Sequence, residues 1–118
     1  MEIKTANDLY RFATRACTAN SVMPVEFVRL PRVTCRDGWS VSIQAGSAFY
    51  SWPREDLADE YGAFELGYQS SREALLDEWA EADYCTGEID YLRCVFPFVP
   101  VEVVDAVIDK HGGIDHVG

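Results

Sequence analysis

The chain lacks the residue patterns that usually identify an enzyme. It has two histidines, His111 and His116, both within its last eight residues. A metal site there would need a third ligand folded back onto them. Its four cysteines form no Cys-x-x-Cys pair, and no glycine-rich phosphate loop is present. We therefore predict no catalytic residues, no metal, no cofactor and a protein that is not an enzyme.

Long apolar runs are missing as well. No stretch approaches the roughly 20 apolar residues that span a bilayer, and no apolar segment follows the first charged residues as in a signal peptide. These absences predict a cytoplasmic protein with no membrane partner. In a reducing compartment thiols stay reduced, so we expect four free cysteines, namely Cys17, Cys35, Cys85 and Cys94.

What the chain does contain is enough apolar material for one folded domain over residues 1–118. It is 48% hydrophobic and has three tryptophans, six tyrosines and six phenylalanines, whereas disordered acidic segments lack such aromatics. The pattern predicts an α+β fold, an antiparallel sheet of four to six strands with about three helices packed on it.

Helices are predicted where apolar residues recur at helical spacing after a capping residue. The first starts at Thr5 or Asn7 and ends near residue 20. The second follows the capping box Ser70-Ser-Arg-Glu73 and runs to about residue 83. The third begins after Pro100 and ends at Gly112-Gly113, with Lys110 and His111 as cations at its negative end. His116 is then expected in a tail.

Strands are predicted where β-branched and aromatic residues alternate between turn signals. The strongest signal is Asp37-Gly38, which we expect to turn a hairpin between residues 33–35 and 39–44. Further strands are expected at residues 25–30 (an edge strand between two prolines), 48–52, 63–68 and 91–99, the last ended by Pro97.

Positive charge is scarce where negative charge is densest. Residues 55–90 hold twelve carboxylates and one cation, Arg72, which sums to −11 in a chain whose net charge is −10. Such a block repels nucleic acid and anionic membranes and attracts basic protein surfaces. The partner-binding residues predicted from it are Glu55, Asp56, Asp59, Glu60, Glu73, Asp77, Glu78, Glu81 and Asp83.

Three of these acids indicate how such a surface could imitate nucleic acid. On the predicted second helix, Glu73, Asp77 and Glu81 are spaced i, i+4, i+8, and neighbours at that spacing lie about 5–6 Å apart. Phosphates along a duplex strand repeat on a broadly similar scale, with about 3.4 Å of axial rise per nucleotide. The alternative is a solvated acidic face that only keeps the protein soluble.

Two segments carry a resemblance to a known class of proteins. Residues 31–45 (PRVTCRDGWSVSIQA) and 98–114 (FVPVEVVDAVIDKHGGI) look like segments of small phage and prophage proteins, and the compact, acidic, motif-free chain resembles phage-encoded anti-CRISPR proteins. The resemblance implies a non-enzymatic inhibitor in the host bacterial cytoplasm. Its partner would be a CRISPR effector subunit or a nuclease, and it would block nucleic-acid binding or nuclease recruitment.

Two other classes of function remain open from the residues. One is a small enzyme or ligand-binding domain whose site follows no recognised motif. The other is a phage structural component that assembles with itself through the apolar run at residues 94–99. The sequence is compatible with a monomer or a homodimer.

Overall fold

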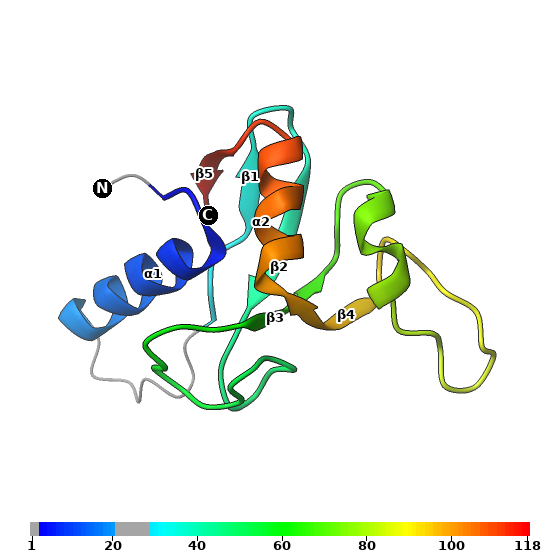
Figure 1. Ribbon diagram of the computed structural model, residues 1–118, viewed down its shortest axis with the longest axis horizontal. Coiled ribbons are helices and arrows are strands. Elements are labelled where there is room, and N and C mark those ends of the chain that lie inside the picture. Colours follow the sequence, from blue (N-terminus) through cyan, green and yellow to red (C-terminus); the bar gives the residue numbers. More distant parts are fainter. Residues whose placement is uncertain (1–2, 21–28) are drawn as a thin grey trace.

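The computed structural model describes residues 3–20 and 29–118. Within them the chain forms an α+β fold, as predicted, with three helices packed on one antiparallel sheet of five strands in the order β4-β3-β2-β1-β5 (Figure 1). The elements in chain order are α1 (Ala6–Asn20), β1 (Val33–Cys35), β2 (Ser40–Gln44), β3 (Ala63–Gly67), the 3-10 helix η2 (Ala74–Trp79), β4 (Val95–Pro100), α2 (Val101–Lys110) and β5 (Ile114–Val117).

The hairpin at Asp37-Gly38 forms where the sequence predicts it. β1 pairs with β2 so that Val33 lies opposite Val41. Gly38 adopts φ +94° in the connecting loop, a conformation that favours glycine because it has no Cβ. The Asp37 carboxylate accepts a hydrogen bond of 2.9 Å from the Trp39 amide, which fixes the turn from within.

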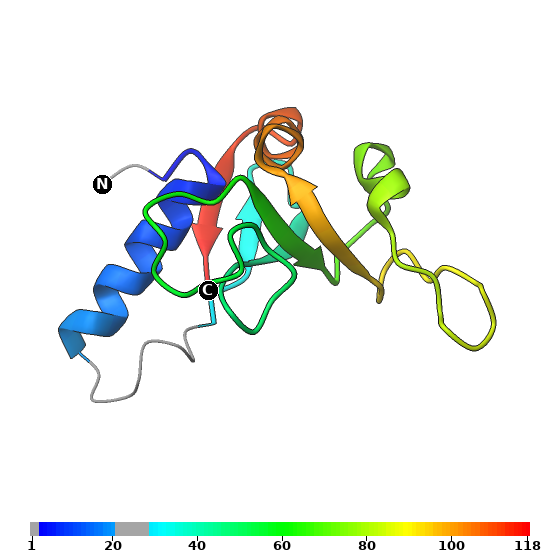
Figure 2. The ribbon, with the colours of Figure 1, turned by 60° about the horizontal axis from the view of Figure 1, so that its bottom comes forward.

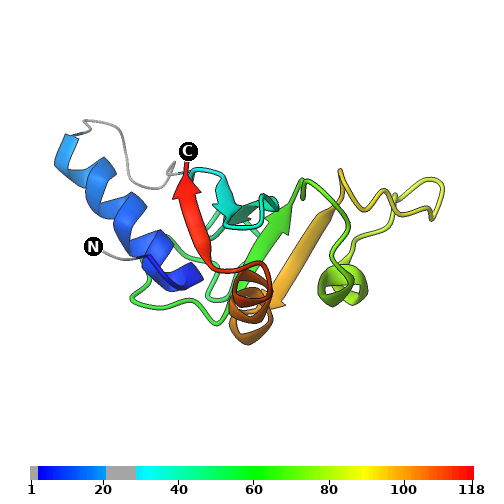
Figure 3. The ribbon, with the colours of Figure 1, turned by 90° about the horizontal axis from the view of Figure 1, so that it is seen from above.

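One hydrophobic core joins the sheet to both α-helices. α2 packs against β3 and β4 and also contacts α1, and Figures 2 and 3 show α2 lying across the strands with α1 beside β5. The largest fully buried side chains come from every one of these layers: Leu9, Val33, Val41, Ile43, Tyr61, Phe64, Leu66, Leu76, Phe96, Val99, Val104 and Ile108. No helix in the described residues is both long enough and apolar enough to cross a membrane.

The start of α1 follows the predicted capping chemistry. The Thr5 hydroxyl accepts from the Asp8 amide at 3.1 Å, and the Asp8 carboxylate accepts from the Thr5 amide at 3.2 Å. Two orphan donors of the helix end are satisfied reciprocally in this way. The Ala6 amide donates to Asp105 of α2 at 3.1 Å, which ties the two helices together.

Three strand predictions need correction. Residues 48–50 form a turn and bends, Ser51 has no regular structure, and only Trp52 of this segment makes an isolated bridge, to Ala63. Pro97 lies inside β4, where it is tolerated because β4 is an edge strand. The expected tail is instead β5, which pairs with β1 and places Val117 opposite Val33. Most of the strand predicted at 25–30 lies outside the described residues.

The second predicted helix is present, but it is shorter than predicted and of another type. Only six residues, Ala74–Trp79, are helical, and they form a 3-10 helix that ends at Ala80 in an extended conformation. The Ser70 hydroxyl accepts from the Ser40 amide rather than capping a helix. The i, i+4, i+8 row of Glu73, Asp77 and Glu81 therefore does not form, because the helix ends before Glu81.

Candidate functional site

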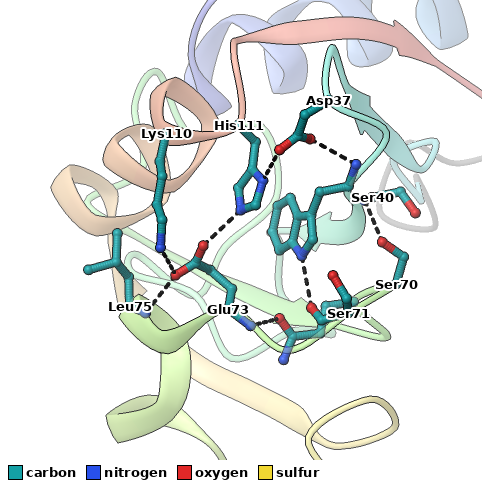
Figure 4. Close-up of polar contacts among 10 residues, drawn as sticks. Asp37, Ser40, Ser70, Ser71, Glu73, Leu75, Lys110 and His111 are labelled. Atoms are coloured by element: carbon teal, nitrogen blue, oxygen red, sulfur yellow. Dashed lines mark hydrogen bonds and ion pairs between the residues drawn. The ribbon is translucent and has the colours of Figure 1, made fainter.

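The most connected polar cluster in the described chain surrounds His111, just after α2 (Figure 4). Its Nδ1 lies 2.5 Å from the Asp37 carboxylate and its Nε2 lies 2.7 Å from that of Glu73. Lys110 Nζ reaches the other oxygen of Glu73 at 2.9 Å. The ring thus lies between two carboxylates, one at each nitrogen. We call Asp37, Glu73, Lys110 and His111 the charge cluster.

Glu73 is the buried centre of the charge cluster, with only 2% of its surface exposed. It accepts a further hydrogen bond of 2.7 Å from the Leu75 amide, so it is also the N-cap of η2. Burial by itself would raise the pKa of this carboxyl. The hydrogen bonds from Leu75, Lys110 and His111 outweigh burial and hold the pKa below its ordinary value.

Asp37 differs because it lies at the surface in the hairpin loop. The Trp39 amide and then the His111 ring hold the pKa of the Asp37 carboxyl below its ordinary value. The Trp39 indole stacks on the His111 ring, with 4.5 Å between ring centroids and 11° between planes. Its Nε1 donates to the Ser71 carbonyl at 2.9 Å. The β1–β2 hairpin, the η2 segment and the end of α2 thus meet at the His111 imidazole.

The charge cluster suits a structural role better than acid–base catalysis. Both ring nitrogens of His111 already lie within hydrogen-bond distance of carboxylates of this chain, so neither nitrogen faces a site that a substrate could occupy. Burial, assisted by the charge of Asp37, raises the pKa of the neighbouring Cys35 thiol to about 11, which keeps this thiol protonated and unreactive. The arrangement can bind three segments together, and nothing in it activates a nucleophile.

The sequence-based interpretation missed this cluster. It treated His111 as a cationic cap of the last helix and Glu73 as a partner-binding acid. The three joined segments lie 38 and 74 residues apart, and no local spacing indicates such a pairing. The one available signal was that His111 and Lys110 are adjacent cations in an acidic chain.

A second candidate site is the loop of residues 81–94 between η2 and β4, here called the acidic loop. It extends away from the rest of the molecule at the end opposite α1 (Figures 1 and 3). All ten residues from 81 to 90 are exposed, and they include Glu81, Asp83, Glu88 and Asp90 but no lysine or arginine. Tyr84 is fully exposed within it.

The acidic loop is shaped by its own hydrogen bonds. The Glu81 amide donates to the Val95 carbonyl at 3.0 Å, which closes its base. Further out, the Asp83 amide donates to the Glu88 carbonyl at 2.7 Å. The Asp83 carboxylate accepts from the amides of Cys85 and Thr86, and these bonds hold its pKa below the ordinary value. Asp83 is therefore required for the shape of the loop as well as for its charge.

The structure divides the predicted partner-binding acids between separate surfaces. Glu55, Asp56, Asp59 and Glu60 precede β3 on the side near α1, whereas Glu78, Glu81 and Asp83 lie at or in the acidic loop (Figure 1). Glu60 pairs with Arg11 at 3.5 Å, and Asp56 accepts from both the amide and the hydroxyl of Ser47.

Two of the predicted acids are engaged within the fold. Glu73 is buried in the charge cluster and cannot reach a partner. Asp77 makes two hydrogen bonds with the Arg72 guanidinium, of 3.0 and 3.1 Å. Glu78 is exposed directly before the acidic loop. The exposed acids at this end are thus concentrated from residue 78 to residue 90, and one of them, Asp90, pairs with Arg93 of the same loop at 4.0 Å.

An open cleft of about 580 Å³ runs along the inner side of the acidic loop, lined by Glu81, Asp83, Glu88, Asp90, Arg93 and Cys94 among others. Within the residues that the structure describes, no three histidine, cysteine or carboxylate side chains are grouped so that they could hold a metal ion. Cys35, Cys85 and Cys94 are free thiols.

No protein-family model, curated protein or solved structure matches the chain. The site is therefore interpreted from its geometry and charge.

Proposed function

We propose that this protein is a non-enzymatic inhibitor that binds a basic, nucleic-acid-handling bacterial defence protein, such as a CRISPR effector subunit or a nuclease, through its acidic loop. Binding there would occupy the surface that holds guide or target nucleic acid, or the surface that recruits a nuclease, in the cytoplasm of a host bacterium. The observation that carries the proposal is the run of ten consecutive exposed residues with four carboxylates and no cation.

Charge and shape of the loop both support this use. Carboxylates on a projecting loop attract a basic surface over long range and speed association. The hydrogen bonds at Glu81 and Asp83 arrange the loop before binding, which reduces the entropy lost when a partner orders it. Tyr84, fully exposed among the acids, offers the kind of aromatic anchor that carries much of the energy in an interface.

The competing use of the apolar run at residues 94–99 has less support. Phe96 and Val99 are fully buried in the core of this chain, and Val95 pairs with Gly67 of β3. Only Phe98 in that run is exposed. Most side chains of the run therefore already have an intramolecular role, and self-assembly would depend on Phe98 and on the outer edge of β4.

The test reverses the charge of the loop without removing the bonds that shape it. We expect the triple variant Glu78→Lys, Glu81→Lys, Glu88→Lys to lose the partner while it keeps the parent's fold, since these carboxylates are exposed. Captures from a bacterial lysate, compared by mass spectrometry, identify the proteins held by the parent and not by the variant. Each is then purified, and its nucleic-acid binding or cleavage is measured with and without this protein.

A matched control separates a local surface from net charge. The variant Glu55→Lys, Asp59→Lys, Glu102→Lys changes the net charge by the same amount at exposed positions outside the loop. It should bind as the parent does. Binding should also weaken as salt rises, because exposed charges are screened beyond about 10 Å at 0.1 M. If both variants bind like the parent, or only the control loses binding, the acidic loop is not the interface.

A further inference from the structure

Three bulky residues in the described chain hold a left-handed backbone conformation. They are Leu57, Tyr68 and Phe98, with φ of +57°, +55° and +52°. Each is also among the exposed large hydrophobic residues. This conformation costs roughly 1–2 kcal/mol for a residue with a side chain, and such strain is found preferentially where function requires it. A core contact explains none of the three, because each side chain reaches solvent.

Phe98 has the clearest structural setting. The pairing of β3 with β4 shifts register between Phe64 and Leu66, so that two residues of β4, Pro97 and Phe98, lie opposite Glu65. A bulge of this kind re-aims a side chain. It turns Phe98 outward against Tyr50, with 5.7 Å between the ring centroids. The Phe98 amide donates to the Tyr50 carbonyl at 3.0 Å, which fixes the two segments together.

Trp52 is exposed two residues after Tyr50, in the same segment. Ser51 is fully buried and its hydroxyl bonds to the Gly46 and Pro53 carbonyls, whereas its neighbours Tyr50 and Trp52 are exposed. Trp52 has 68% of its surface exposed, more than any other aromatic residue that the structure describes outside the acidic loop. Tyr50, Trp52 and Phe98 thus present three rings to solvent from two segments that are bonded to each other; we call them the aromatic surface.

The aromatic surface is suited to an arginine side chain. The chain already places one guanidinium there, since Arg54 lies 4.9 Å from the centroid of the Tyr50 ring. A carboxylate adjoins the same ring, because Glu65 accepts from the Tyr50 amide at 3.1 Å. Tryptophan is the ring that attracts a cation most strongly. The net charge of −10 favours a cationic partner over nucleic acid and over a second copy of this chain.

We propose that Tyr50, Trp52 and Phe98 form a docking surface for an arginine side chain of a partner polypeptide. The guanidinium stacks on the exposed Trp52 and Phe98 rings, next to the ring that Arg54 covers, with Glu65 as the nearby anion. This surface lies on the loop after β2 and on β4, apart from the carboxylates of the acidic loop. It therefore does not depend on the function proposed above.

The test follows the indole N–H resonances of the protein by NMR while a short peptide is added. The probe is acetyl-Gly-Arg-Gly-Arg-Gly-amide, compared with the same peptide carrying lysine or the neutral isostere citrulline in place of arginine. Of the three indoles, Trp39 donates to Ser71 and the Trp79 Nε1 is buried. We expect the arginine peptide to shift the Trp52 resonance, the lysine peptide to bind several-fold more weakly and the citrulline peptide to leave it unchanged.

Variants separate docking from a structural role. Phe98→Gly suits the φ of +52°, so its melting temperature should not fall, while its affinity for the arginine peptide should fall about tenfold. Trp52→Ala changes the most exposed of the three rings and should lose affinity for the arginine peptide to a similar degree. It replaces Phe98→Gly as the test if that variant does not fold. The control Leu92→Ala removes an exposed apolar side chain elsewhere and should bind as the parent does.

The variant Glu78→Lys, Glu81→Lys, Glu88→Lys should keep its arginine-peptide binding, which distinguishes this surface from the acidic loop. The proposal is overturned if the Trp52 resonance does not move up to about 1 mM peptide, or if citrulline and arginine peptides act alike. It is overturned equally if Phe98→Gly and Trp52→Ala bind like the parent, or if the Trp52 resonance shifts only with protein concentration, which would indicate a second copy as the occupant.

Discussion

The substitution Glu73→Gln tests whether the charge cluster holds the fold together. It keeps the size and shape of the side chain and removes its charge. The carboxylate now accepts three hydrogen bonds, from Leu75 and Lys110 on one oxygen and from His111 on the other. Glutamine offers one oxygen and one amide group, and the amide group can only donate. When the glutamine oxygen faces Leu75 and Lys110, its amide group faces His111 Nε2, which can accept from it only if that nitrogen carries no proton. Turned the other way, the amide group faces the Leu75 and Lys110 donors.

The expected loss in the free energy of unfolding follows from how deeply each side chain of the charge cluster is buried. Removing one partner of a fully buried ion pair costs about 3–5 kcal/mol. Lys110 is half exposed, at 51% of its side chain, and can turn to water, which lowers the cost. His111 stays with only 15% of its side chain exposed and with the Asp37 carboxylate still beside it. We therefore expect the free energy of unfolding to fall by about 2–3 kcal/mol at neutral pH.

The assay is urea unfolding of parent and variant at several pH values. The pKa of Glu73 is lowered in the folded protein from its ordinary value of 4.5, so its stabilising contribution is complete above that value. It is lost as pH falls through the lower, folded pKa. The difference between parent and variant should be larger at neutral pH than in acid and should shrink below about pH 4. The pKa of Asp37 is also lowered, so protonation of Asp37 destabilises both parent and variant in the same acid range.

The matched control is Glu81→Gln, which removes a carboxylate that is exposed in the acidic loop. Its free energy of unfolding should stay within about 0.5 kcal/mol of the parent. A Glu73→Gln protein as stable as this control would refute the structural role of the cluster. So would a stability difference that is the same at acid and neutral pH, because the charge of Glu73 would then contribute nothing.

Three smaller predictions concern the fold. Gly38→Val should lower the free energy of unfolding by more than about 1 kcal/mol in urea titrations, because its φ is +94° although no atom would crowd the added Cβ; an unchanged stability would contradict the turn. Thr5→Ala should cost about 1 kcal/mol by the same measurement, through loss of the cap that accepts from Asp8, and an undiminished stability would show that α1 starts without it. Cys85, which is exposed, should react with a thiol reagent in the native protein, whereas buried Cys35, with its pKa raised to about 11, should react only after unfolding; equal rates would contradict this burial.

The parts of the fold that sequence predicts well are those fixed by local chemistry. The hairpin turn is predicted by Asp37-Gly38 alone, because the turn requires a residue with positive φ and glycine adopts it. The start of α1 is predicted by Thr5, because its hydroxyl accepts from an amide only three residues later. α2 follows from apolar spacing and the glycines after it. The fold class follows from these elements together, because each has a face that must be covered.

The parts that sequence predicts poorly depend on distant partners. Residues 74–83 have helical spacing, but Glu73 turns inward to Lys110 and His111, and the helix stops at Trp79. β5 is too short to be recognised alone and forms because β1 offers it an edge. Among the site residues, the acidic loop keeps some predicted carboxylates, whereas Glu73 becomes a structural residue. Tyr50, Trp52 and Phe98 were not predicted as a surface, since only the bulge in β4 brings them together.

The distance along the chain between bonded segments has a consequence for synthesis. β1 receives its second neighbour only when β5 has been made, and the first amide of α1 finds its acceptor at Asp105, 99 residues later. Contacts of such long range fold slowly, since a large loop must close before they form. A chain leaving the ribosome therefore carries an unpaired edge of β1 until β5 has emerged. Such edges bind chaperones or aggregate, so we expect the yield of native protein to depend on the speed at which residues 101–117 are translated.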